Sequence, residues 1–113
     1  MQLKLNTRVE KGVTIVDCDG RIVFGEESAL LRDTLKKMIV ENSQIVLNLR
    51  GISYIDSGGL GTLVALYTTA QNAGGGVKLA NLTQRVDDLL QVTKLLTVFD
   101  AYEDEAEALK SFS

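Results

Sequence analysis

The residues best suited to chemistry lie in segment 54–63, where Asp56 and Ser57 separate an apolar run from an amphipathic run. Three glycines follow Ser57 within four residues. A serine with such small neighbours could be a hydrolytic nucleophile, or it could be a side chain that another protein reaches. The surrounding residue types decide between these two hypotheses.

The nucleophile hypothesis fails on the residues that such chemistry needs. A nucleophile elbow has the pattern G-x-S-x-G, but Ile55 occupies the first glycine position, and the chain has no histidine to act as the base. The glycines at 59 and 61 do not form a dinucleotide fingerprint, because Val64 stands where the third glycine belongs. The glycines at 74–76 lack the Lys-Ser/Thr ending of a phosphate-binding loop. We also see no carboxylate pair and no metal-ligand cluster, so we expect no enzyme activity, cofactor or metal.

The strand–loop–helix junction at Asp56 remains. Asp and Ser are preferred helix N-caps, which accounts for these two residues without any function. The glycines exceed what a cap needs, because glycine in a helix costs up to ~1 kcal/mol relative to alanine. They would let another backbone approach closely and leave the Ser57 hydroxyl unscreened. This combination predicts a serine that a partner protein must reach.

Phosphorylation of Ser57 would suit such a position. A phosphoserine adds about −1.5 to −2 charge at pH 7. At a helix N-terminus this charge meets the positive end of the helix dipole, so the fold should tolerate it. A partner packed on bare glycine backbone would instead meet a bulky dianion beside Asp56. We therefore predict a switch in binding with an intact fold.

Composition supports one globular domain spanning residues 1–113. The chain carries a net charge of −3, its residues are 45% apolar, and only 5% are aromatic. The scattered basic residues argue against nucleic acid as a partner. The sequence has no apolar run long enough for a membrane span and no signal-peptide pattern, so we expect a cytoplasmic protein. The single cysteine, Cys18, is interpreted as a buried thiol in a strand.

The elements that position the junction begin with an expected β-meander. Lys11-Gly12 and Asp19-Gly20 are predicted turns, the second as a hairpin turn. The expected strands cover residues 3–9, 13–18 and 21–24.

Helices and strands then alternate along the rest of the chain. The apolar spacing predicts a helix that opens at Gly25 and stops near Asn42, and a second over 58–73. Thr83 and Asp104 are predicted N-caps of two further helices. Expected strands cover 45–49 and 77–80, and residues 97–99 are either a short strand or an extended connector. This order predicts an α/β fold with a mixed sheet and about four helices packed mainly on one face.

The whole chain resembles the STAS domain, specifically the bacterial anti-sigma factor antagonists. Their hallmark, Asp-Ser-Ser/Thr-Gly-Leu/Ile-Gly after an apolar strand, is present here as Asp-Ser-Gly-Gly-Leu-Gly at 56–61. Residues 45–49 and 77–82 resemble the strands before and after the motif. Residues 95–99 through 107–109 resemble the usual C-terminal end.

The resemblance implies a binding switch rather than an enzyme. Ser57 would be phosphorylated by its partner, an anti-sigma factor with a GHKL-type serine kinase fold. The unphosphorylated antagonist would bind this partner and free the sigma factor, and a PP2C-type phosphatase would restore the serine. The expected partner-contact residues are Gly20, Arg21, Asp56, Ser57, Gly58, Gly59 and Leu60.

Two departures from the family pattern leave alternatives open. Gly58 replaces the second hydroxyl residue of the motif, and Val23 stands where many members carry an aspartate. A STAS scaffold of a stress-signalling assembly, or a regulatory subunit of a membrane transport system, is therefore the alternative. A small-ligand binder is a third hypothesis. The identity of the partner and the oligomeric state, monomer or weak dimer, stay open.

Overall fold

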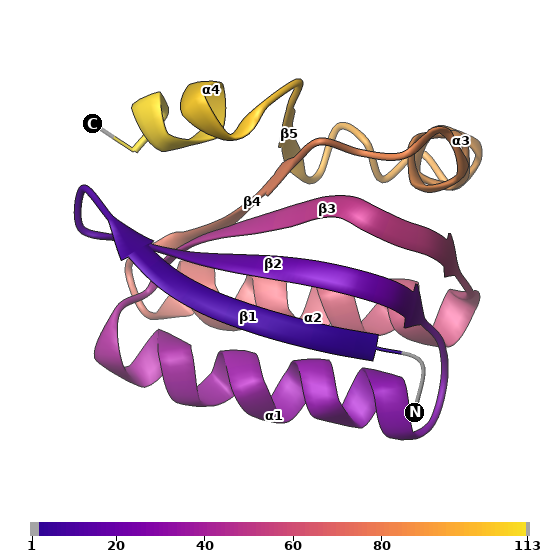
Figure 1. Ribbon diagram of the computed structural model, residues 1–113, viewed down its shortest axis with the longest axis horizontal. Coiled ribbons are helices and arrows are strands. Elements are labelled where there is room, and N and C mark those ends of the chain that lie inside the picture. The colour runs from indigo at the N-terminus through magenta and orange to yellow at the C-terminus, as the bar shows by residue number, and fades with distance from the viewer. Residues whose placement is uncertain (1–2, 113) are drawn as a thin grey trace.

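The computed structural model describes residues 3–112, which form two consecutive strands followed by alternating helices and strands, five strands and four helices in all (Figure 1). The strands are β1 (Leu3–Glu10), β2 (Val13–Ile22), β3 (Gln44–Ile55), β4 (Gly76–Ala80) and β5 (Asp100–Tyr102). The helices are α1 (Glu26–Glu41), α2 (Ser57–Asn72), α3 (Gln84–Val92) and α4 (Glu105–Lys110).

The sheet is mixed, as predicted, and its strand order is β1-β2-β3-β4-β5. β1 and β2 pair antiparallel through a tight turn at Lys11 and Gly12, which adopt positive φ angles of 53° and 77°. The later pairs are parallel, because a helix-containing connection returns the chain to the same end of the sheet each time. The carboxyl ends of β2 and β3 therefore lie at one end of the sheet.

The predicted hairpin at Asp19-Gly20 is wrong. β2 runs straight through both residues to Ile22, and it pairs with β1 on one side and β3 on the other. The two residues make the strand irregular instead of ending it. The pairing register between β2 and β3 shifts on each side of Asp19-Gly20, and Gly20 has a φ of 120°. Pairing with two neighbouring strands outweighs a local turn preference. The expected three-strand meander is consequently a two-strand hairpin.

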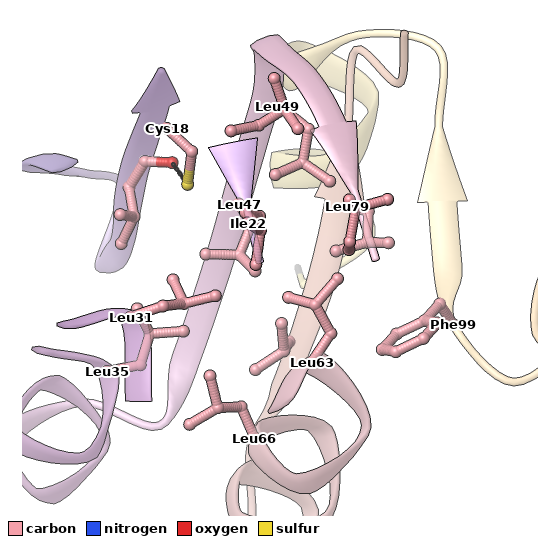
Figure 2. Close-up of a cluster of buried hydrophobic side chains, with 14 of the residues drawn as sticks. Cys18, Ile22, Leu31, Leu35, Leu47, Leu49, Leu63, Leu66, Leu79 and Phe99 are labelled. Atoms are coloured by element: carbon pink, nitrogen blue, oxygen red, sulfur yellow. Dashed lines mark hydrogen bonds between the residues drawn. The ribbon is translucent and has the colours of Figure 1, made fainter. Parts of the chain in front are cut away.

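The helices cover the sheet unequally. α1 and α2 lie side by side on one face, over the main core, where Leu35 and Leu63 are fully buried (Figures 1 and 2). Val86 and Leu90 of α3 join the same cluster. α4 packs on the opposite face, where Ala108 closes a smaller apolar cluster. The expectation of four helices mainly on one face is confirmed, with α4 as the exception.

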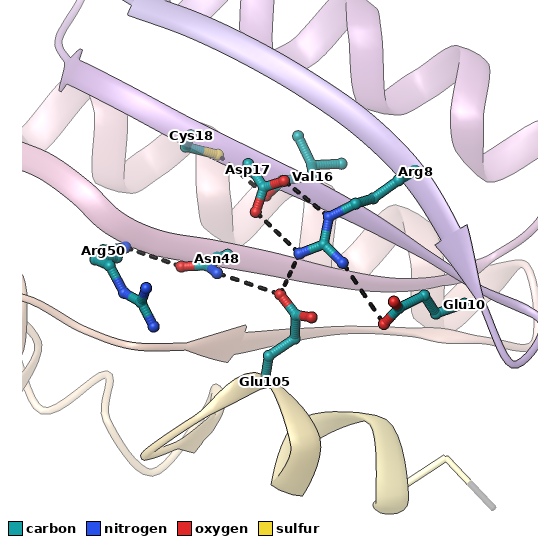
Figure 3. A network of polar contacts seen from close by, with 8 residues as sticks. All are labelled: Arg8, Glu10, Val16, Asp17, Cys18, Asn48, Arg50 and Glu105. Atoms are coloured by element: carbon teal, nitrogen blue, oxygen red, sulfur yellow. Dashed lines mark hydrogen bonds and ion pairs between the residues drawn. The ribbon is translucent and has the colours of Figure 1, made fainter.

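A polar network attaches α4 to the strands beneath it (Figure 3). The Arg8 guanidinium donates to both carboxylate oxygens of Asp17, with N–O distances of 2.9 and 3.2 Å, and also to Glu105 at the start of α4. The Asn48 side-chain amide donates to the same Glu105 carboxylate at 3.2 Å. α4 is thus held by one glutamate that reaches β1 and β3.

Several predicted boundaries shift in the structure. β3 continues past the predicted end at residue 49, because Gly51 lets the backbone of β2 come close: a Cβ there would lie 2.9 Å from the Cys18 carbonyl oxygen. Residues 97–99 were expected to be a short strand or an extended connector, but they form a turn in which the Val98 and Phe99 N–H groups donate to the Leu95 carbonyl, and the strand follows at β5. Cys18 is buried in β2 as predicted, and burial raises the pKa of its thiol to about 12.

Candidate functional site

Ser57 is the first residue of α2, and its side chain is exposed where the chain leaves β3. Of the two expected cap residues, Asp56 is the N-cap, and its carboxylate accepts a hydrogen bond from the Gly59 N–H at 2.8 Å. Its own N–H donates to the Ile22 carbonyl at 3.2 Å. The end of β2 therefore fixes the backbone immediately before the serine.

The Asp56 carboxylate also holds a second segment. The Phe24 N–H, in the loop between β2 and α1, donates to both carboxylate oxygens at 3.1 Å each. Hydrogen bonds from Gly59 and then Phe24 lower the pKa of Asp56 below its usual range. The side chain is thus a negative charge that ties the β2–α1 loop to the first turn of α2.

The three glycines after Ser57 have different environments. A Cβ on Gly59 would lie 2.0 Å from the Ile22 carbonyl oxygen, and a Cβ on Gly58 would lie 2.7 Å from the Phe24 Cβ. A Cβ on Gly61 would meet no atom within 4 Å. The sequence interpretation assigned the glycines to the approach of a partner. In the structure Gly58 and Gly59 serve close contacts inside the chain, and Gly61 faces open space.

The predicted contact residues on α2 differ in exposure. Ser57 is exposed, and Asp56 and Gly58 are half-buried. Gly59 and Leu60 are buried, and Leu60 packs in the main core. A partner that binds at this turn could contact Ser57 directly. Gly59 and Leu60 are buried and would affect the contact only through the conformation of the turn.

The other two predicted contact residues lie in β2 rather than in a turn. Gly20 is half-buried and Arg21 is exposed. Arg21 pairs with Tyr54 of β3, two residues before Asp56. The structure therefore brings both residues to the end of the sheet from which α2 starts, although the hairpin that was expected to present them is not formed.

Sequence reasoning missed Phe24, which it placed in a strand. Its side chain is 81% exposed, and it lies against Gly58. An aromatic residue directly before the glycine that opens a helix was the available signal. The ring completes a surface formed by Phe24, Ser57 and Gly58, hereafter the switch patch.

Other features of the described residues lie away from the switch patch. A hollow of about 860 Å³ lies between α3 and β5 and is lined by residues such as Leu82, Phe99 and Tyr102. Within 3–112, histidine, cysteine, aspartate and glutamate nowhere gather in groups of three that could hold a metal ion. No helix in that range has the length and apolarity to cross a membrane.

The fold and the motif define a class of protein. The profile of the STAS domain family matches residues 4–108, and the chain belongs to this family.

Two curated relatives are antagonists of anti-sigma factors. The anti-sigma F factor antagonist of Paenibacillus polymyxa is 27% identical over 111 residues, which is 96% of this chain and 94% of that protein. The anti-sigma-B factor antagonist of Bacillus subtilis (strain 168) is 32% identical over 71 residues, 63% of this chain and 65% of that protein.

A solved structure shares the fold. The crystal structure of a putative anti-sigma factor antagonist from Thermotoga maritima superposes with a TM-score of 0.88 at 21% identity, covering 96% of this chain and 93% of that one. The order of the elements and the topology of the sheet are therefore those of a STAS fold.

Proposed function

We propose that this chain is an anti-sigma factor antagonist. Its unphosphorylated form binds an anti-sigma factor that is also a serine kinase, and the sigma factor is released. Phosphorylation of Ser57 abolishes this binding, and a PP2C-type phosphatase restores it. The observation that carries the proposal is an exposed serine at the first position of α2, beside Asp56, in a STAS chain whose relatives bear this name.

The first turn of α2 suits a phosphate that leaves the fold unchanged. The turn contains no acidic side chain, and it lies at the positive end of the dipole of a 16-residue helix. Asp56 lies outside the helix as its N-cap and keeps its bonds to Gly59 and Phe24. A phosphate on Ser57 then adds to the charge of Asp56 and makes the switch patch strongly negative.

Two physical effects make that change decisive for a partner. A surface complementary to a small hydroxyl beside Gly58 has no room for a phosphate. Burying the phosphate charge in an interface without a matching cation costs several kcal/mol, because the charge loses its hydration. Phosphorylation would therefore switch binding off. The proposal further takes the protein to be cytoplasmic, to be a substrate of its partner kinase, and to use no cofactor of its own.

The test is a pull-down from lysate of the source organism with ATP present. Tagged wild type, Ser57→Ala and Ser57→Asp chains are compared, the retained proteins are identified by mass spectrometry, and phosphate on Ser57 is located. We expect Ser57→Ala to retain a kinase-fold protein that Ser57→Asp does not retain, and we expect phosphate on wild-type Ser57.

Thr68 provides the matched control. It is an exposed hydroxyl residue on the same helix, three turns away from the switch patch. Thr68→Ala and Thr68→Asp should both bind as wild type does. If Ser57→Asp retains the same kinase-fold protein as Ser57→Ala, or if Ser57 carries no phosphate, the proposed function is wrong.

A further inference from the structure

Phe24 is unusual among the exposed apolar residues. Among the large apolar residues that the structure describes, those more than one-third exposed are valines except for Phe24, which is 81% exposed. An aromatic ring offers a large apolar area with few rotatable bonds, which is why such residues are enriched in interfaces. The ring lies against Gly58, the residue after Ser57, rather than at an unrelated place on the surface.

The peptide unit directly before this ring is held by hydrogen bonds from two elements. The Phe24 N–H donates to the Asp56 carboxylate, and the Val23 carbonyl accepts from the Ser28 N–H at 3.1 Å and from the Ser28 hydroxyl at 2.7 Å. These bonds come from α1 and from the N-cap of α2. The exposed ring is therefore carried by an ordered loop.

Gly58 is matched to this position of Phe24. A Cβ at residue 58 would lie 2.7 Å from the Phe24 Cβ, 3.1 Å from Cδ1 and 3.2 Å from Cα. These separations are shorter than non-bonded carbon atoms tolerate, so any side chain at 58 would displace Phe24. The serine or threonine that the family motif carries there is incompatible with this loop. The glycine at 58 and the phenylalanine at 24 thus belong together.

We propose that Phe24 is the apolar anchor of the partner contact, and that Phe24 and Gly58 together determine which partner binds. The proposal rests on the proposed function, and it specifies the partner's chemistry. The anti-sigma factor presents an apolar pocket for the Phe24 ring directly beside the site that receives the Ser57 hydroxyl. Arg21, exposed at the same end of the sheet, provides a cation at the rim of this contact.

The first test measures affinity by calorimetry. The probe is the purified kinase-fold protein that the Ser57→Ala chain retains, and all variants carry Ser57→Ala. Phe24→Ala should weaken binding at least about tenfold, as truncation of an interface anchor does. Val40→Ala is the matched control, since Val40 is 87% exposed in the last turn of α1 and should change the dissociation constant by less than about twofold.

The second test uses Gly58→Ala, which displaces the ring without removing it. Gly58→Ala alone should weaken binding about as much as Phe24→Ala does. The variant that carries both substitutions should bind as tightly as Phe24→Ala alone. Additive losses would show that Gly58 contacts the partner independently of Phe24, which overturns the pairing. Thermal unfolding of each variant verifies that the fold is retained.

The outcomes separate this inference from the proposed function. If Phe24→Ala binds like its parent while Ser57→Asp still abolishes binding, the switch stands and the anchor is wrong. If Phe24→Ala weakens binding and Ser57→Asp does not, the anchor stands and the switch is wrong.

Discussion

Two helices of this chain, α2 and α4, begin with an aspartate N-cap, but only the cap of α2 also holds a distant segment. At α4, Asp104 accepts from the Glu107 N–H at 2.9 Å and makes a local closure. At α2, Asp56 makes the same local bond and also holds Phe24, 32 residues earlier in the chain. The first turn of α4 carries Glu105 and Glu107, whereas that of α2 carries no acidic residue.

The difference separates the cap from the site. Both aspartates satisfy a helix N-terminus, and sequence predicts both equally well. Two features distinguish α2: its cap also accepts a hydrogen bond from a distant residue, and its first turn contains two consecutive glycines and no acidic residue. An added phosphate is compatible with the start of α2, whereas at α4 it would meet two glutamates.

The largest expected change in the free energy of unfolding concerns the glycines in the first two turns of α2. Gly59→Ala should destabilise the fold by at least about 3 kcal/mol, because its Cβ would lie 2.0 Å from the Ile22 carbonyl oxygen. Gly61→Ala, in open space, should be neutral or stabilise by about 0.5 kcal/mol through helix propensity. Urea unfolding of the two variants measures both values. Equal effects would show that the close contact with β2 does not constrain this turn.

The next effect compares the two caps directly. Asp56→Ala should cost about 2 kcal/mol, because it removes the cap and leaves the Phe24 N–H without its partner. Asp104→Ala should cost about 1 kcal/mol, since it removes a local cap from a six-residue helix. Chemical denaturation under identical conditions gives the difference. A smaller loss at Asp56 than at Asp104 would contradict the long-range role.

The pH dependence of stability sharpens the same comparison. Because hydrogen bonds lower the pKa of Asp56 below the ~3.9 of an unfolded aspartate, the unfolded chain binds its proton first as pH falls. The stabilisation is complete above that unfolded pKa and disappears as pH falls through the lower folded pKa. The stability gap between wild type and Asp56→Asn should therefore narrow from about pH 5 to pH 3. A constant gap in denaturation titrations would rule out this linkage.

The smallest expected change in the free energy of unfolding comes from the ion pair at the start of α4. Glu105→Gln should cost no more than about 1 kcal/mol, because the ion pair with Arg8 is partly exposed to solvent. Added salt should reduce this cost further, since it screens the pair. The matched neighbour Glu107→Gln should cost less than Glu105→Gln. Thermal unfolding at low and high salt gives both values.

Sequence predicted the parts of this fold that are set locally. The caps at Asp56, Thr83 and Asp104 were correct, because an N-cap depends on a few adjacent residues. The alternation of helices and strands from Gly25 onward was also correct. The serine of the motif was found from its neighbours, and the structure exposes it as expected.

The wrong sequence predictions concern residues whose conformation is determined by contacts with distant segments of the chain. Asp19-Gly20 has hairpin chemistry, but pairing with β1 and β3 keeps it in a strand. The strand that was expected to end at residue 49 continues to Ile55, with Gly51 allowing the close approach of β2. Phe24 was missed because nothing adjacent to it in sequence reveals that Asp56 holds its N–H. Each of these outcomes depends on a contact more than 30 residues away along the chain.

The bond from Phe24 to Asp56 has a consequence for the thermodynamics of association. A loop that orders only on binding loses backbone entropy in the complex, about 1–2 kcal/mol for each residue fixed. Here the carboxylate has already fixed the backbone that carries the ring, so association immobilises little more than the side chain. A preorganised aromatic residue of this kind converts more of its buried area into affinity. In the proposed contact, the aspartate of the motif thus contributes to binding through the backbone that it fixes, in addition to any contact of its own.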